Sequence, residues 1–133
     1  MPFRFLRIIA RCEDDLDYPI YIDAPVDEAG IILTKGWLFG CMGKLLGDRL
    51  NPFVGRLDKD EPSPRFPFLL DFGTDFPDAD RFYWTNLTLK RVRKGEQFTI
   101  RMPSEGEESG FGEFIYEIRD LIDMVLQQPI DGI

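Results

Sequence analysis

The most closely spaced carboxylates lie between Asp71 and Asp80, in the segment Asp-Phe-Gly-Thr-Asp-Phe-Pro-Asp-Ala-Asp. Oxygen ligands at such a spacing can hold Ca²⁺ or Mg²⁺. The spacing of an EF-hand is absent, however, and Phe72, Phe76 and Pro77 interrupt the acidic run. We therefore interpret these aspartates as turn residues that accept hydrogen bonds from their own backbone. The sequence predicts no metal site and no cofactor.

The chain contains no histidine, which is the commonest general base and a frequent metal ligand. A hydrolase built from two carboxylates needs one carboxyl group with a raised pKa beside another that stays ionised. Asp71, next to several aromatic residues, could be the first of these, but the sequence indicates no second. We therefore expect that the protein is not an enzyme. The alternative is a carboxylate-based hydrolase, or a small-ligand site, near Asp71–Trp84.

Aromatic side chains gather between residues 66 and 84, next to two arginines. The aromatic residues are Phe66, Phe68, Phe72, Phe76, Phe82, Tyr83 and Trp84. Most such residues lie in a core, but aromatics rimmed by arginine are enriched at the energetic centres of protein interfaces. We expect a protein-binding surface that includes Arg65, Phe72, Phe76, Arg81, Tyr83 and Trp84.

Charge is distributed unevenly along the chain. Basic residues cluster between residues 90 and 94, whereas residues 103–133 carry eight acidic groups and one arginine. An exposed basic cluster usually protects a sheet edge from pairing with another sheet. The alternative is a contact point for an acidic partner or for the acidic part of a second copy. On that interpretation, Arg91, Arg93 and Lys94 belong to the binding surface.

The net charge limits the kinds of partner. The 133 residues carry a formal charge of −8, which opposes binding to nucleic acid or to an anionic membrane surface and favours solubility or a basic partner. Arg7 interrupts the apolar N-terminal run, and no stretch approaches the roughly 20 apolar residues of a membrane span. Cys12 and Cys41 are interpreted as free thiols. We expect a soluble, cytoplasmic protein.

Two stretches toward the C-terminus position many of these residues. Residues 82–90 and 97–102 are rich in aromatic, β-branched and alternating apolar side chains, and Gly95 lies between them, which indicates a β-hairpin. From residue 111 onward, apolar side chains recur every three or four positions, which predicts an amphipathic helix. The apolar positions are Phe111, Phe114, Ile115, Ile118, Leu121, Ile122 and Val125. We expect this stripe to pack on the apolar face of the hairpin.

The N-terminal half is less uniform. Residues 3–12 and 17–24 indicate a second hairpin, whereas residues 34–50 allow two interpretations. Apolar residues at helical spacing favour a helix there, along which Gly36, Gly40, Gly43 and Gly47 would form a smooth groove. Each glycine costs a helix about 0.8–1 kcal/mol relative to alanine. The alternative is therefore that residues 31–40 form a strand or loop and that the glycines occupy turns.

Together these patterns predict one α+β domain over residues 1–133. It would be a mostly antiparallel sheet with a C-terminal amphipathic helix packed on one face, and a second helix near residues 34–50 under the first interpretation. We expect a small acidic, non-enzymatic protein-binding module of the inhibitor, immunity or adaptor kind. It would act through the aromatic surface, on another protein or on a second copy as a homodimer.

Overall fold

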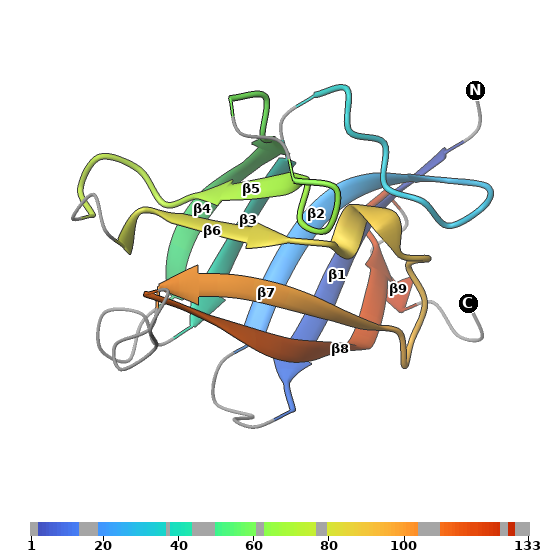
Figure 1. Cartoon of the computed structure of the whole chain (residues 1–133). Helices are drawn as coiled ribbons and strands as arrows, with labels where there is room; N and C mark the ends of the chain where they lie inside the picture. The colour runs from blue at the N-terminus through green and yellow to red at the C-terminus, as the bar shows by residue number, and fades with distance from the viewer. Residues whose placement is uncertain are drawn as a thin grey trace.

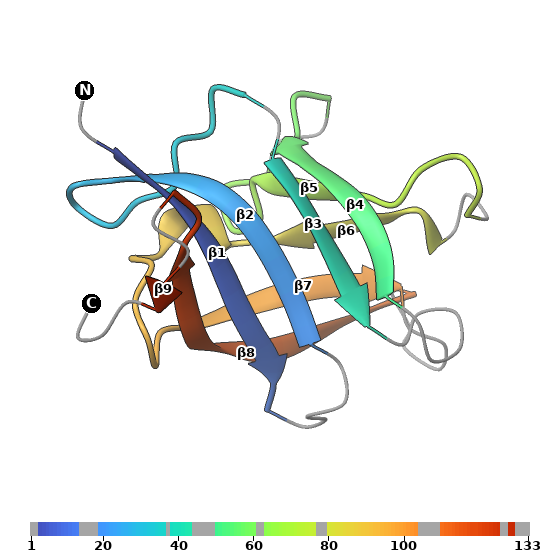
Figure 2. The same cartoon turned by 180° about the vertical axis from the view of Figure 1, so that it is seen from behind.

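The computed structural model describes residues 3–13, 19–36, 38–43, 50–60, 63–76, 80–103, 110–125 and 128–129. Eight antiparallel strands form a closed barrel, in which each strand pairs with the next and the last pairs with the first (Figures 1 and 2). The strands are β1 Phe3–Cys12, β2 Pro19–Asp27, β3 Leu38–Gly43, β4 Leu50–Leu57, β5 Phe68–Asp71, β6 Phe82–Thr85, β7 Gln97–Pro103 and β8 Phe111–Asp123. A short strand, β9 Gln128–Pro129, pairs with the end of β8.

The predicted α+β class is wrong, because the described residues form an all-β barrel. Among the elements of the described residues, the helical one is the 3-10 turn η2, Leu87–Leu89, between β6 and β7. No helix in the described ranges is long and apolar enough to cross a bilayer.

The predicted C-terminal helix is strand β8. Its residues pair with β7 along one edge and with β1 along the other. The spacing that indicates a helix has a different cause. Ala10 pairs with Ile118 but Ile9 pairs with Asp120, so Arg119 is an extra residue in β8. Because of this β-bulge, Ile118 and Leu121 both point inward although they are three residues apart.

Residues 38–43 form strand β3, so the helix interpretation of residues 34–50 is wrong for the described part; residues 44–49 lie outside it. Gly40 lies within a strand, so it neither lines a groove along a helix nor occupies a turn. A Cβ atom at Gly40 would lie 2.5 Å from Cζ of Phe53 and closer still to the Tyr21 carbonyl oxygen. Gly55 has the same relation to Phe68, at 2.6 Å. These glycines make room inside the barrel for aromatic rings from neighbouring strands.

Both predicted hairpins are confirmed in part. Strand β1 pairs with β2, and β6 pairs with β7, each antiparallel. Gly95 has φ 87° in the connection before β7, as the turn requires. The first arm of the second hairpin is shorter than expected, because β6 ends at Thr85 and η2 follows.

Alternate residues of every long strand face the interior. Strand β1 buries Leu6, Ile8, Ala10 and Cys12, and β2 buries Ile20, Ile22, Ala24 and Val26. Large rings fill the space between the strands, among them Phe53, Phe68, Phe98 and Tyr116. An eight-stranded barrel has an interior just wide enough for side chains to fill. Side chains that a partner can reach therefore lie on the outer wall of the barrel.

Candidate functional site

Two buried apolar side chains lie outside the interior cluster. Phe66 and Leu69 are both buried, yet neither belongs to the cluster that fills the barrel. Leu69 in β5 pairs with Trp84 in β6, and Trp84 pairs with Arg101 in β7. Trp84 is only half-buried. The outer wall over β5–β8 thus carries its own apolar cluster.

This cluster surrounds a hollow that we call the aromatic pocket. Its volume is about 180 Å³, and it is lined by Asp58, Ser63, Phe66, Trp84, Arg101 and Phe111. The rings of Trp84 and Phe111 meet edge to face, with centroids 5.6 Å apart and planes at 80°. The indole Nε1–H donates a hydrogen bond of 3.0 Å to Oδ2 of Asp58. That bond fixes the ring plane of Trp84, so the wall of the pocket is preformed.

Arginines stack on two of the aromatic rings. The guanidinium carbon of Arg101 lies 4.7 Å from the centroid of Phe111, and that of Arg65 lies 5.0 Å from the centroid of Phe66. Arg65 also forms an ion pair of 3.3 Å with Glu113. Among the described residues, no carboxylate forms an ion pair with Arg101. The contact with the Phe111 ring positions the guanidinium at the pocket, and in the part of the chain that the structure describes no residue accepts a hydrogen bond from its N–H groups.

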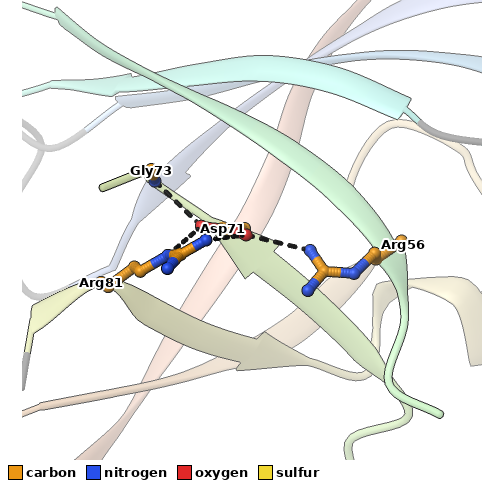
Figure 3. A network of polar contacts seen from close by, with 4 residues as sticks. All are labelled: Arg56, Asp71, Gly73 and Arg81. Carbon is orange, nitrogen blue, oxygen red and sulfur yellow. Dashed lines mark hydrogen bonds and ion pairs between the residues drawn. The ribbon is translucent and has the colours of Figure 1, made fainter. Parts of the chain in front are cut away.

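A second polar feature of the same wall centres on Asp71 (Figure 3). Its carboxylate accepts hydrogen bonds from Nε and Nη2 of Arg81, at 2.8 and 3.1 Å, and from Nη1 of Arg56, at 3.1 Å. The backbone N–H of Gly73 donates a further bond of 2.9 Å. The Asp71 side chain is only 12% exposed. This carboxylate joins β4, β5 and the segment before β6.

Those contacts fix the ionisation state of Asp71. The hydrogen bond from Arg81 lowers the pKa of Asp71 most; burial raises it, and the bonds from Gly73 and Arg56 lower it further, so the pKa lies below its ordinary value. A general acid needs the opposite shift. Asp71 is therefore ionised at neutral pH and links two arginines and the backbone of Gly73. This direction of shift does not suit the general acid that the hydrolase alternative assigned to Asp71.

The structure divides the predicted binding residues into interior and outer groups. Phe72 and Tyr83 are buried in the barrel, with ring centroids 4.8 Å apart, and Phe76 packs on Phe72 at 5.4 Å. These three aromatics belong to the core. Arg65 and Trp84 lie at the aromatic pocket. Arg81 lies beside it, with its guanidinium carbon 4.7 Å from the centroid of Phe82.

The basic residues form a separate group. Arg91, Arg93 and Lys94 lie in the connection that precedes β7, whereas Arg101 lies toward its other end (Figure 1). Arg93 pairs with Glu96 at 3.2 Å, and Lys94 pairs with Asp120 of β8 at 3.7 Å. One basic residue of this connection, Lys94, thus contacts an acidic residue of the C-terminal segment within the same chain.

Of the six lining residues, only Trp84 was predicted as a binding residue; the other five, Asp58, Ser63, Phe66, Arg101 and Phe111, were not. Arg101 was not singled out, because the sequence pattern specified no register for the hairpin; in the structure it lies opposite Trp84. Phe111 was assigned to a helix but lies in β8, opposite Pro103 of β7. Asp58 is brought in by the connection between β4 and β5, and its contact with Trp84 spans 26 residues of sequence.

The described residues include no group of three His, Cys, Asp or Glu side chains placed to hold a metal. In the predicted acidic run, Asp71 is engaged by arginines, Asp75 and Asp80 are exposed, and Asp78 lies outside the described residues. Cys12 and Cys41 are free thiols, the first buried inside the barrel and the second half-buried on its outer wall. None of these side chains adds chemistry to the aromatic pocket.

Comparisons of the chain with known protein families, with curated proteins and with solved structures find no match. The features of this chain that bear on function are therefore the geometry and charge of its outer wall.

Proposed function

We propose that this chain is a non-enzymatic protein-binding module that engages its partner through the aromatic pocket. The observation that carries the proposal is an apolar cluster outside the barrel, built around a half-buried Trp84 and topped by two stacked arginines. The interior cluster does not include Phe66 or Leu69. Tryptophan and arginine are the residues most enriched where interface binding energy concentrates.

The size of the pocket favours a side chain over a free ligand. Sites for small molecules usually enclose about 300–1,000 Å³, whereas the aromatic pocket measures about 180 Å³. One apolar or aromatic side chain of a partner fits such a space better than a cofactor or metabolite does. The N–H donors of Arg101, a half-buried lining residue, can then bind a carboxylate or backbone carbonyl beside that anchor.

The overall charge acts at longer range. With a net charge of −8, the molecule attracts a partner whose surface is basic overall, and that attraction speeds encounter more than it strengthens the complex. The pocket itself, with Arg65 and Arg101, selects an anchor with a neighbouring acceptor. The partner that fits both requirements is a basic protein that presents one apolar side chain next to an oxygen acceptor.

Affinity capture from cells of the source organism, with quantitative mass spectrometry, tests this proposal. Trp84→Ala and Arg101→Ala should each lose the same partner that the wild-type chain retains. Leu89→Ala, at an exposed apolar residue of η2, should retain it. With the purified partner, we expect Trp84→Ala to weaken binding by about tenfold or more. A partner held equally by the wild-type chain and by both pocket variants would contradict the proposal.

A further inference from the structure

The outer wall over β2–β4 carries a different apolar surface. In the closed ring of strands, β3 lies four positions from β7, so this wall is opposite the aromatic pocket. Figure 2 shows β2, β3 and β4 side by side on the face turned to the viewer. Phe39 is 59% exposed and Leu50 is 49% exposed on this face. Singly exposed apolar side chains are common, whereas contiguous ones can mark an interaction surface; Phe39 and Leu50 line one hollow.

A hollow lies between these two side chains. It has a volume of about 350 Å³ and is lined by Arg7, Tyr21, Asp23, Phe39, Gly40, Cys41 and Leu50. Tyr21 pairs with Cys41 and Asp23 pairs with Phe39 across β2 and β3, so the apolar and charged parts of the hollow adjoin. The same surface therefore presents both a projecting aromatic ring and a recess that can receive one.

The charge of this surface distinguishes its occupant. Nε and Nη2 of Arg7 donate to the two carboxylate oxygens of Asp23, at 2.8 and 2.9 Å. The hollow thus carries one positive and one negative side chain and has no net charge, although the chain carries −8. The surface of a strongly basic or strongly acidic partner would have no complementary net charge at this hollow. A second copy can match it, because contacts across a two-fold axis are reciprocal: if Arg7 of one copy meets Asp23 of the other, the Asp23 of the first also meets the Arg7 of the second.

We propose that two copies of this chain associate through the outer wall of β2–β4 as a symmetric dimer. Phe39 of each copy enters the hollow of the other, beside Tyr21 and Cys41. Arg7 of one copy lies near Asp23 of the other, which sets the orientation of the pair. The two aromatic pockets stay on the far sides of the dimer, available to partners. This inference is independent of what binds in those pockets.

Sedimentation velocity over a micromolar concentration series tests the dimer directly. The wild-type chain should pass from monomer to dimer as its concentration rises. Phe39→Glu would set two carboxylates into apolar hollows, and we expect it to raise the dimer dissociation constant by about tenfold or more. Leu50→Glu is a second variant on the same wall. Both residues are exposed, so circular dichroism should show an unchanged fold.

Ile115→Glu is the matched control. Ile115 lies on the outer face of β8 and is 45% exposed, so the same substitution adds the same charge away from the proposed interface. This variant should dimerise as the wild-type chain does. A wild-type chain that is monomeric throughout, or equal weakening by Ile115→Glu and Phe39→Glu, would overturn the inference.

Cys41 supplies an independent readout of which wall is in contact. It lines the hollow, whereas Cys12 is buried inside the barrel. A short bifunctional maleimide should therefore link two wild-type copies through Cys41. Cys41→Ser should abolish the linked dimer and Phe39→Glu should reduce it strongly. Linking that persists undiminished in Phe39→Glu would show that the copies meet elsewhere.

Discussion

Asp71 illustrates how neighbouring side chains decide what a carboxylate can do. In the sequence it lies among aromatics, which suggests burial and a raised pKa. In the barrel it accepts hydrogen bonds from Arg56, Arg81 and the backbone of Gly73 (Figure 3). The opposite charges outweigh the burial, so the pKa of Asp71 is lowered. Its role is to hold two arginines on the outer wall.

Replacing Asp71 with asparagine keeps the shape of the side chain but removes the charge. We expect the free energy of unfolding at neutral pH to fall by about 1–3 kcal/mol, because the two guanidinium groups lose the negative charge and one of the two acceptor oxygens is replaced by an NH2 donor. Since the folded-state pKa lies below the ordinary value of 3.8, this stabilisation is present above that pH and is lost as the pH falls through the folded-state value. The difference in the free energy of unfolding between the wild-type chain and Asp71→Asn should therefore become smaller as the pH falls.

Urea denaturation at a series of pH values from neutral down to about 3 measures that difference. Asp75→Asn is the control, because Asp75 is exposed in the same segment and should change stability little at any pH. If the free energy of unfolding falls by the same amount in both variants at neutral pH, the contacts of Asp71 with the two arginines do not stabilise the fold.

Strand β8 has a sequence pattern that is typical of an amphipathic helix. A strand alternates its faces at every residue, so apolar positions three apart point to opposite sides. The extra residue Arg119 resets the alternation between Ile118 and Leu121. Together with the partly exposed Ile115, this produces a spacing of threes and fours over residues 111–125. The bulge is visible only once β1 lies alongside.

The two interpretations of this segment predict different results for two isoleucines. In the barrel, Ile118 is buried inside and Ile115 is 45% exposed outside, whereas a helix would bury both. Ile118→Asp should lower the free energy of unfolding by about 4 kcal/mol or more, because it sets an unpaired charge in the interior. Ile115→Asp should cost less than about 1 kcal/mol. Chemical denaturation of both variants measures the two costs, and similar costs would contradict the strand.

At the scale of the whole molecule, the two surfaces lie on opposite walls of one barrel. The aromatic pocket is formed by β6–β8 and the connection between β4 and β5, and the neutral hollow by β2–β4 and Arg7 of β1. A dimer through the second surface would present two pockets outward. Such an arrangement raises the apparent affinity for a partner with two matching anchors, without any new contact, provided that its anchors can span the distance.

Association of like-charged copies should depend on salt. Each chain carries −8, so two copies repel each other at long range until salt screens them, with a Debye length of about 30 Å at 0.01 M and about 10 Å at 0.1 M. The dimer dissociation constant should therefore fall severalfold between about 0.01 M and 0.1 M NaCl. Sedimentation velocity at both salt concentrations measures it. A dissociation constant that rises with salt would indicate an interface held by opposite charges.

Some parts of this structure follow from the sequence alone, because they depend on neighbours along the chain. The alternation in residues 3–12 and 97–102 and the glycine at 95 are local signals, and the hairpins β1–β2 and β6–β7 are where they indicate. The enrichment of aromatics and arginine near residues 65–84 was less informative: Arg65, Arg81 and Trp84 lie on the outer wall, whereas Phe72, Phe76 and Tyr83 pack in or against the core.

Other parts were decided by pairings between distant segments. Ile8 lies opposite Leu121, and this pairing of β1 with β8 closes the barrel and fixes residues 111–123 as a strand. No local pattern contains that information, because the bulge at Arg119 and the rings over Gly40 and Gly55 exist only against their neighbouring strands. Phe72 and Tyr83 are buried in the closed interior, whereas Trp84 lies on the other face of β6 and meets Phe111 through the successive pairings β6–β7 and β7–β8. The aromatic pocket is therefore a product of tertiary structure, because its lining combines three paired strands with the connection between β4 and β5.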